Sequence, residues 1–155
     1  MRTPHIATQC AYADRVLAKS LSASVGDAEL GSYLSSYLVV MLSGLYEDCI
    51  EHLIDLRVQR TGDSEVGSYV AKTLQATFRN PTFENVLGLL GKFSKQYANR
   101  LKTAVHERDA QALDSIVNNK NAIAHGMSSN LTLKDVEDFH RRTIVILEAL
   151  ENILV

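Results

Sequence analysis

The chain of 155 residues is long enough to bury a core of its own, and its 46% of hydrophobic and 22% of charged residues are typical of a globular protein. Its formal net charge is −2, so no overall positive field draws it to nucleic acid or to an anionic membrane. The first twenty residues lack the apolar run of a signal peptide, and the longest apolar stretch, residues 38–42, is far too short to span a bilayer.

Cys10 and Cys49 belong to no spacing that is typical of a metal site. We therefore expect two buried free thiols in a soluble, cytoplasmic protein that keeps them reduced. The histidines form no ligand pattern with acids or cysteines, so we expect neither a metal nor a cofactor.

Apolar residues at steps of three and four positions predict helices along the whole chain, and no segment has the period of two that is typical of strands. A modest first helix is expected over 8–21, after frayed residues 1–7. The longest helix is expected over about 28–59, with Asp27 as its N-cap, and a further helix over about 64–78.

The segment 80–82, Asn-Pro-Thr, predicts the start of the next helix, with Asn80 as its cap and Pro81 at its first position. The apolar stripe of this helix includes Phe93 and continues to Leu101. Gly88 and Gly91 each cost ~1 kcal/mol relative to alanine inside a helix, which suggests a kink or a close helix–helix approach. A helix from about Asp109 and a last helix, opened by a capping-box variant at Thr132, complete the chain. The pattern predicts an all-α fold, a single-domain bundle of about five to six helices over residues 1–155.

Residues 113–126, LDSIVNNKNAIAHG, carry polar side chains that a plain core helix would not contain. Lys120 lies within the apolar stripe of this helix, while Asn118, Asn121 and His125 share another face. A glycine follows His125 and ends the helix, so the imidazole lies in the last turn.

Residues 117–126, VNNKNAIAHG, resemble the signature of HEPN domains, and most closely that of the RiboL-PSP-type HEPN subgroup, whose late helix carries RN, two or three residues, then AHG. The long early helix with carboxylates near its middle (SGLYED, 43–48), the helix start at Asn80 and the capped last helix are also similar. The resemblance covers about residues 33–155 and leaves 1–32 as an N-terminal extension.

The resemblance implies an HEPN-like bundle that acts as a homodimer on RNA, because many HEPN proteins are metal-independent endoribonucleases of toxin–antitoxin or phage-defence systems. It also implies a cognate antitoxin or regulatory protein as a further partner, and no membrane. Other HEPN proteins have lost catalysis and serve as modules for dimerisation or for binding RNA, a nucleotide or a protein. Lys120 stands where the family has arginine, which keeps the charge but loses the planar fork that suits a phosphate. Both alternatives therefore stay open.

RNA cleavage without a metal needs a base for the 2′-OH, an acid for the leaving 5′-oxygen and a cation for the phosphate. On this interpretation His125 of each subunit supplies the acid or the base, Lys120 the cation, and Asn121 orients the ring or the phosphate, so that the product carries a 2′,3′-cyclic phosphate. Asn118 supports the same face. Glu47, with Asp48 as its substitute, is expected beside Lys120, because a buried unpaired ammonium is unfavourable.

Structural roles remain alternatives for each of these residues. His125 could simply cap the helix, Lys120 could extend its ammonium out of the core, and the asparagines could form a solvated face. The segment 88–92, GLLGK, lacks the spacing of a phosphate-binding loop. The last helix could carry either a basic edge or an ordinary solvated face, at Lys134, His140, Arg141 and Arg142.

Overall fold

The computed structural model describes residues 3–155, which form seven α-helices and, within that range, no strand. The expected all-α class is confirmed, and the number of helices exceeds the expected five to six. The helices are α1 (Pro4–Ala23), α2 (Ala28–Gln59), α3 (Ser64–Thr77), α4 (Phe83–Phe93), α5 (Lys95–Ala104), α6 (Glu107–Ala124) and α7 (Leu133–Leu154).

The additional helix results from a break at Ser94, where the apolar stripe predicts one continuous helix. Ser94 has extended backbone (φ −164°, ψ 129°), and its hydroxyl accepts a hydrogen bond of 3.2 Å from the backbone N–H of Gln96, so it ends α4 and caps α5. Gly88 and Gly91 lie inside α4, where a Cβ at either position would meet nothing within 4 Å. The turn also leaves Phe93 exposed, against the expectation that it packs in the stripe.

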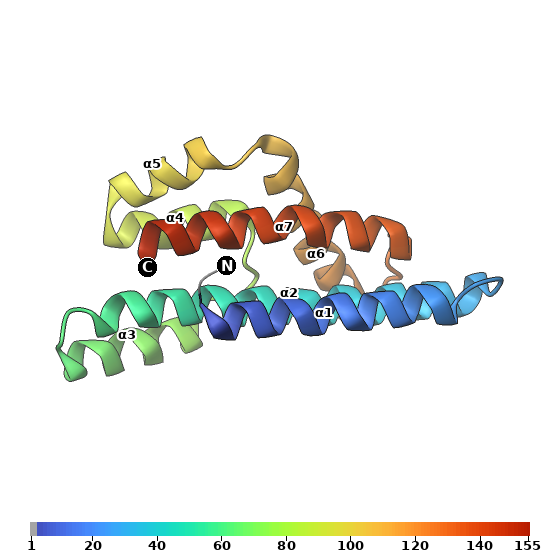
Figure 1. Cartoon of the computed structure of the whole chain (residues 1–155), viewed down its shortest axis with the longest axis horizontal. Helices are drawn as coiled ribbons and strands as arrows, with labels where there is room; N and C mark the ends of the chain where they lie inside the picture. Colours follow the sequence, from blue (N-terminus) through green and yellow to red (C-terminus); the bar gives the residue numbers. More distant parts are fainter. Residues whose placement is uncertain (1–2) are drawn as a thin grey trace.

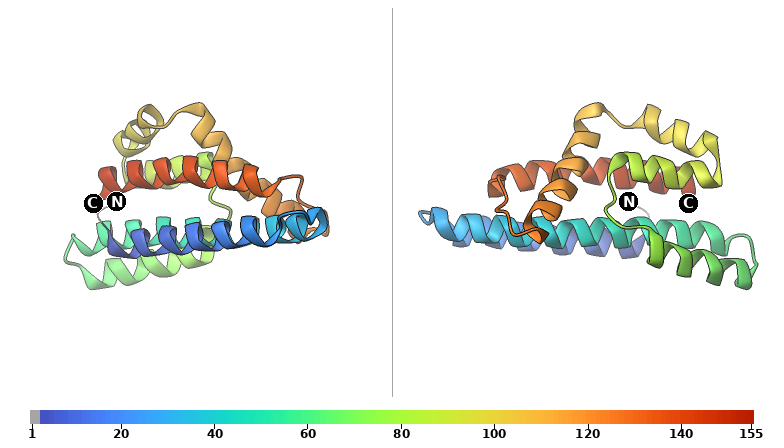
Figure 2. Two further views of the ribbon diagram at one scale, coloured as in Figure 1. Left: turned by 45° about the vertical axis from the view of Figure 1, so that its right-hand side comes forward. Right: turned by 180° about the vertical axis from the view of Figure 1, so that it is seen from behind.

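Helix α2 is the central element of the fold, because α1, α3, α6 and α7 all pack against it. Figure 1 shows α1, α2 and α7 running along the long axis of the molecule, and α4 and α5 form a helical hairpin whose members contact α6 and α7, respectively. Seen from behind in Figure 2, α6 crosses α7 and its C-terminal end reaches α2. Asp27 caps α2 as expected, because its carboxylate accepts a hydrogen bond of 2.9 Å from the N–H of Leu30.

The N-terminal segment is more ordered than the expected frayed stretch 1–7. Residues 1 and 2 lie outside the described residues, but α1 begins at Pro4, and Thr3 and Ile6 are buried. The backbone N–H of Thr3 donates to the buried carboxylate of Glu151 on α7. This contact fixes the start of α1 against the end of the chain.

The two cysteines are buried and free, as expected. Burial raises the pKa of Cys10 to about 11 and that of Cys49 to about 12, since both thiols would have to ionise away from water. They therefore behave as small apolar core residues.

His140 lies in the core, not on a basic edge of the last helix. Its ring is fully buried, with Nδ1 2.8 Å from the Tyr46 hydroxyl and Nε2 3.4 Å from the Asp14 carboxylate. Burial lowers the pKa of His140, and Asp14 opposes this effect only in part. The neighbouring Arg141 pairs with Glu137 of the same helix at 2.7 Å, so it belongs to a solvated face.

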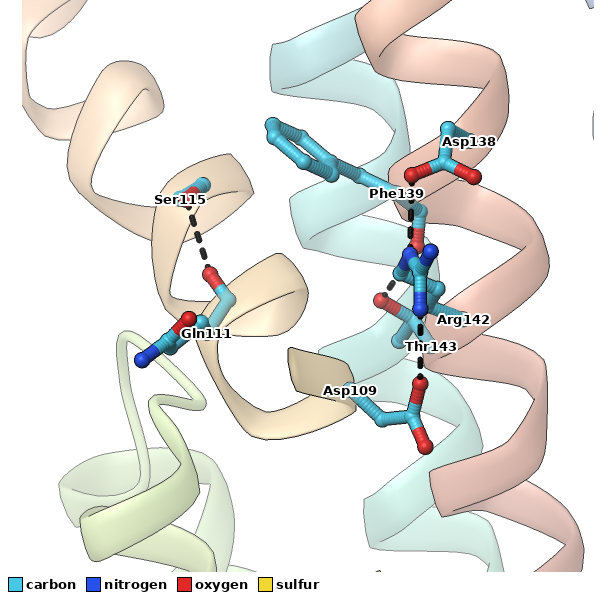
Figure 3. A network of polar contacts seen from close by, with 7 residues as sticks. All are labelled: Asp109, Gln111, Ser115, Asp138, Phe139, Arg142 and Thr143. Atoms are coloured by element: carbon cyan, nitrogen blue, oxygen red, sulfur yellow. Dashed lines mark hydrogen bonds and ion pairs between the residues drawn. The ribbon is translucent and has the colours of Figure 1, made fainter. Parts of the chain in front are cut away.

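Arg142 ties α7 to the first turn of α6 (Figure 3). Its Nε donates to Asp138 at 2.8 Å, and its Nη1 lies 3.5 Å from the carboxylate of Asp109, which is buried at the start of α6. This bridge fixes the N-terminal end of α6 against α7, and the opposite end of α6 carries the polar residues described next.

Candidate active site

The C-terminal end of α6 is closed by its own backbone. His125 is the C-cap and Gly126 adopts the left-handed backbone (φ 80°) that favours glycine. The N–H of Gly126 donates to the carbonyl of Ile123, and the N–H of Met127 donates to that of Ala122, both at 3.0 Å, which is the Schellman arrangement. The imidazole of His125 is exposed and makes no hydrogen bond with any residue of 3–155. Its side chain is therefore not needed as the cap.

Lys120 is half-buried, and two amide oxygens hold its ammonium group. Its Nζ donates to Oδ1 of Asn80 at 2.8 Å and more weakly to Oδ1 of Asn121 at 3.4 Å. In the described part of the chain no carboxylate lies within ion-pairing distance of this ammonium. The expected pairing with Glu47 or Asp48 is therefore wrong, and the positive charge of Lys120 remains uncompensated.

The two carboxylates have other partners. Oε1 of Glu47 accepts a hydrogen bond of 3.0 Å from Nη1 of Arg79, which follows α3, and Nη2 of Arg79 donates to the carbonyl of Gln75 at 2.7 Å. Asp48 instead lies 2.7 Å from Nε2 of His5 on α1. Glu47 thus belongs to the surroundings of the α3–α4 loop, whereas Asp48 contacts α1 and is not brought to Lys120.

Asn80 also contributes to this site, and the sequence pattern does not predict its contact with Lys120. Its backbone is left-handed (φ 55°), a conformation that asparagine tolerates better than most residues. Asn85 donates to its carbonyl at 2.8 Å. The expected cap at Asn80 is wrong, because Thr82 caps α4 two residues later and Pro81 lies before the helix. The sequence indicates only that a half-buried lysine requires a hydrogen-bond acceptor, and it does not identify the residue that supplies it.

The three neighbouring asparagines of α6 have different environments. Oδ1 of Asn119 accepts from the hydroxyl of Ser129 and from the N–H of Asn130, both at 3.3 Å, and holds the loop after α6 against the helix. Asn121 contacts Lys120, and Asn118 is exposed with no hydrogen-bond partner among the described residues. The interpretation of the asparagines as a solvated face is therefore wrong for Asn119 and Asn121 and holds for Asn118.

The end of α6 combines the uncompensated cation of Lys120, the amide of Asn121 and the imidazole of His125, which makes no hydrogen bond within residues 3–155. Asn121 and His125 are four positions apart, so they lie one turn from each other on the helix. In other proteins, groups of these types hold an anion and transfer a proton.

Residues 13–155 match the RiboL-PSP-HEPN family. The chain belongs to this family. The match begins within α1, earlier than the expected residue 33, so it includes most of the first helix of this RiboL-PSP-HEPN chain. No curated protein and no solved structure gave a match.

None of the helices in residues 3–155 has the length and hydropathy that crossing a bilayer requires. Over the same residues, no three side chains of histidine, cysteine, aspartate or glutamate converge closely enough to hold a metal ion.

Proposed function

We propose that this RiboL-PSP-HEPN chain is a metal-independent endoribonuclease that acts as a homodimer. The observation that carries the proposal is the position of the Lys120 ammonium on the helix that ends in an exposed His125. Amide oxygens hold this ammonium, and within residues 3–155 no carboxylate neutralises it. An uncompensated cation attracts a phosphate, and histidine is the side chain most often used as a general acid or base.

In the proposed reaction the 2′-OH of a ribose attacks the adjacent phosphorus. His125 of one subunit removes the proton of the 2′-OH, and His125 of the other gives a proton to the leaving 5′-oxygen, so the products are a 2′,3′-cyclic phosphate and a 5′-hydroxyl. Lys120 stabilises the additional negative charge on the phosphate, and Asn121 orients it. Acid–base catalysis of this kind contributes ~10²–10⁴-fold, and the rest comes from the cation and from orientation.

A second copy of the chain is proposed to bind on the exposed face of α2. Tyr33, Tyr37, Val40 and Gly44 follow one another at steps of four, three and four positions, so they share this face, and all are exposed. Residues 30–46 contain no charged side chain. An apolar face without charge fits a second copy, because a twofold axis brings identical side chains together and like charges would repel.

Gly44 gives this face a further property. A Cβ at Gly44 would meet nothing within 4 Å, so packing within the chain does not explain a glycine that costs ~1 kcal/mol inside a helix. A partner helix that approaches closely would explain it.

The cleavage assay uses single-stranded RNA in the presence of EDTA. The wild type is expected to cleave and to leave 2′,3′-cyclic phosphate ends, and His125→Ala is expected to be slower by ~10² or more. His106→Ala is the matched control, since His106 is an exposed histidine on the opposite end of α6 whose side chain makes no capping hydrogen bond. Absence of cleavage by the wild type, or equal rates for both variants, refutes the proposal.

The second candidate is a catalytically impaired HEPN module for dimerisation and for binding RNA, a nucleotide or a protein. Lys120 in place of arginine favours it, because an ammonium lacks the bidentate fork of a guanidinium. Lys120→Arg separates the two candidates. A large gain in cleavage indicates an impaired nuclease site, whereas retained binding without cleavage indicates a binding module.

We place the nuclease in the cytoplasm, within a toxin–antitoxin or phage-defence system with a cognate antitoxin or regulatory protein as partner. Family membership supports this assignment. Expression in a bacterial host tests it: the wild type is expected to arrest growth and His125→Ala to relieve the arrest. Equal growth with both chains would contradict the toxin role.

A further inference from the structure

The loop between α3 and α4 connects two charged residues that are far apart in sequence. Its consecutive residues Arg79 and Asn80 reach two different helices: the guanidinium of Arg79 binds Glu47 on α2 at 3.0 Å, and the amide of Asn80 binds Lys120 on α6 at 2.8 Å. Because the two loop residues are adjacent, the hydrogen bond between Asn80 and Lys120 also fixes where the side chain of Arg79 begins.

Asn80 holds this loop in an unusual backbone conformation. A positive φ costs free energy in a residue other than glycine and persists only where the surroundings impose it. Here Lys120 holds the side chain of Asn80, and Asn85 holds its carbonyl. The strained residue therefore couples the loop that carries Arg79 to the helix that carries the motif.

The guanidinium of Arg79 is exposed and only partly used. Its side chain is 65% exposed, whereas that of its partner Glu47 is 17% exposed. A guanidinium has five N–H donors, and Arg79 makes one hydrogen bond from Nη1 and one from Nη2 within residues 3–155, which leaves donors free. These donors form the planar fork that suits a phosphate and that Lys120 lacks.

We propose that Arg79 binds a backbone phosphate of the RNA beside Lys120, and so supplies the guanidinium that is absent from the motif itself. Glu47 is a positioning residue: it orients Arg79 in the free protein and releases it when the phosphate binds. This inference rests on the proposed function, because it names a further residue that contacts the same substrate.

The test measures binding of a single-stranded RNA oligonucleotide over a salt series, with His125→Ala as the parent so that no RNA is cleaved. Loss of one phosphate contact is expected to reduce the slope of log K against log[salt] by about 0.7 for a single strand. Arg79→Ala should show this reduction. Arg141→Ala is the matched control and should leave the slope unchanged, since Arg141 is 69% exposed and also pairs with one glutamate, at 2.7 Å.

Two further variants separate phosphate binding from a structural role. Arg79→Gln removes the charge while keeping a long polar side chain, and it should reproduce the reduced slope even if Arg79→Ala folds poorly. Glu47→Gln keeps an acceptor for Arg79 but removes the negative charge that competes with the phosphate, so it should strengthen RNA binding. Unchanged or weaker binding by Glu47→Gln would contradict the positioning role.

The outcomes distinguish this inference from the proposed function. If the parent binds RNA and the slopes of Arg79→Gln and Arg141→Ala are both unchanged, Arg79 contacts no phosphate while RNA binding stands. If the parent binds no RNA at any salt concentration, the proposed function fails and this inference fails with it.

Discussion

The hydrogen bond between Asn80 and Lys120 is the contact that joins the α3–α4 loop to α6, and its removal should be measurable as a loss of stability. Asn80→Ala removes the closer of the two acceptors of the Lys120 ammonium and also places a Cβ-bearing residue without a polar side chain at φ 55°. Asn80→Gly removes the same acceptor but adopts the left-handed backbone without steric cost. The pair of variants therefore separates the hydrogen bond from the backbone strain.

The expected magnitudes follow from the geometry. A hydrogen bond to a charged group contributes about 1.5–3 kcal/mol, and we take about 1.5 kcal/mol because water reaches the half-buried Lys120. Left-handed alanine adds about 1 kcal/mol. Asn80→Ala should therefore lower the free energy of unfolding by about 2.5 kcal/mol and Asn80→Gly by about 1.5 kcal/mol. For a domain of this size these losses lower Tm by about 5–10 °C and about 3–6 °C.

Differential scanning calorimetry measures both values, with Asn118→Ala as the control, because Asn118 is exposed and has no described partner. The control should stay within about 0.5 kcal/mol of the wild type. A double-mutant cycle with Lys120→Met should give a coupling energy of about 1.5 kcal/mol between positions 80 and 120. A coupling energy below about 0.3 kcal/mol would refute the hydrogen bond, and equal losses for alanine and glycine would refute the strain.

Three further predictions concern the core, the dimer and the last helix. Burial lowers the pKa of His140, so below pH ~6.5 the unfolded chain binds a proton that the folded chain does not. The stability that His140→Phe removes should therefore be present above pH ~6.5 and decline below it. Urea unfolding at several pH values measures this, and a difference in the free energy of unfolding between wild type and variant that stays constant with pH contradicts it. Gly44→Arg should make the protein monomeric in sedimentation velocity, whereas Gly88→Arg, at another exposed helical glycine, should leave the dimer intact; identical behaviour of the two contradicts the α2 interface. Thr132→Ala removes the capping box of α7 and should lower the free energy of unfolding by about 1 kcal/mol in denaturant titrations, and no change would mean that the cap is dispensable.

The fold class and most helix boundaries were predictable because periodicity and caps are local signals. The start of α2 at Asp27 and that of α7 at Thr132 follow from the capping side chains, and both are confirmed. The break at Ser94 was not predictable, because the apolar stripe continues across it and a single serine is a weak signal. The burial of His140 depends on Tyr46, 94 positions away, and no local pattern reports such a contact.

The candidate site was predictable only where its residues lie within one helix. Lys120, Asn121 and His125 stand out because an ammonium within the apolar stripe and an imidazole in the last turn are unusual in a core helix. The partner of Lys120 was not predictable, because a carboxylate and an amide oxygen both satisfy an ammonium. The chain uses the amide of Asn80, and it leaves the carboxylate of Glu47 to a neighbouring arginine.

The shared site is tested most directly by mixing wild type with His125→Ala and measuring RNA cleavage in EDTA against the fraction of wild-type chains, after the subunits have exchanged. If one site needs an imidazole from each subunit, cleavage falls with the square of that fraction, to roughly a quarter when half of the chains are wild type. A linear fall would contradict the shared site, and absence of cleavage from the unmixed wild type would contradict the nuclease itself.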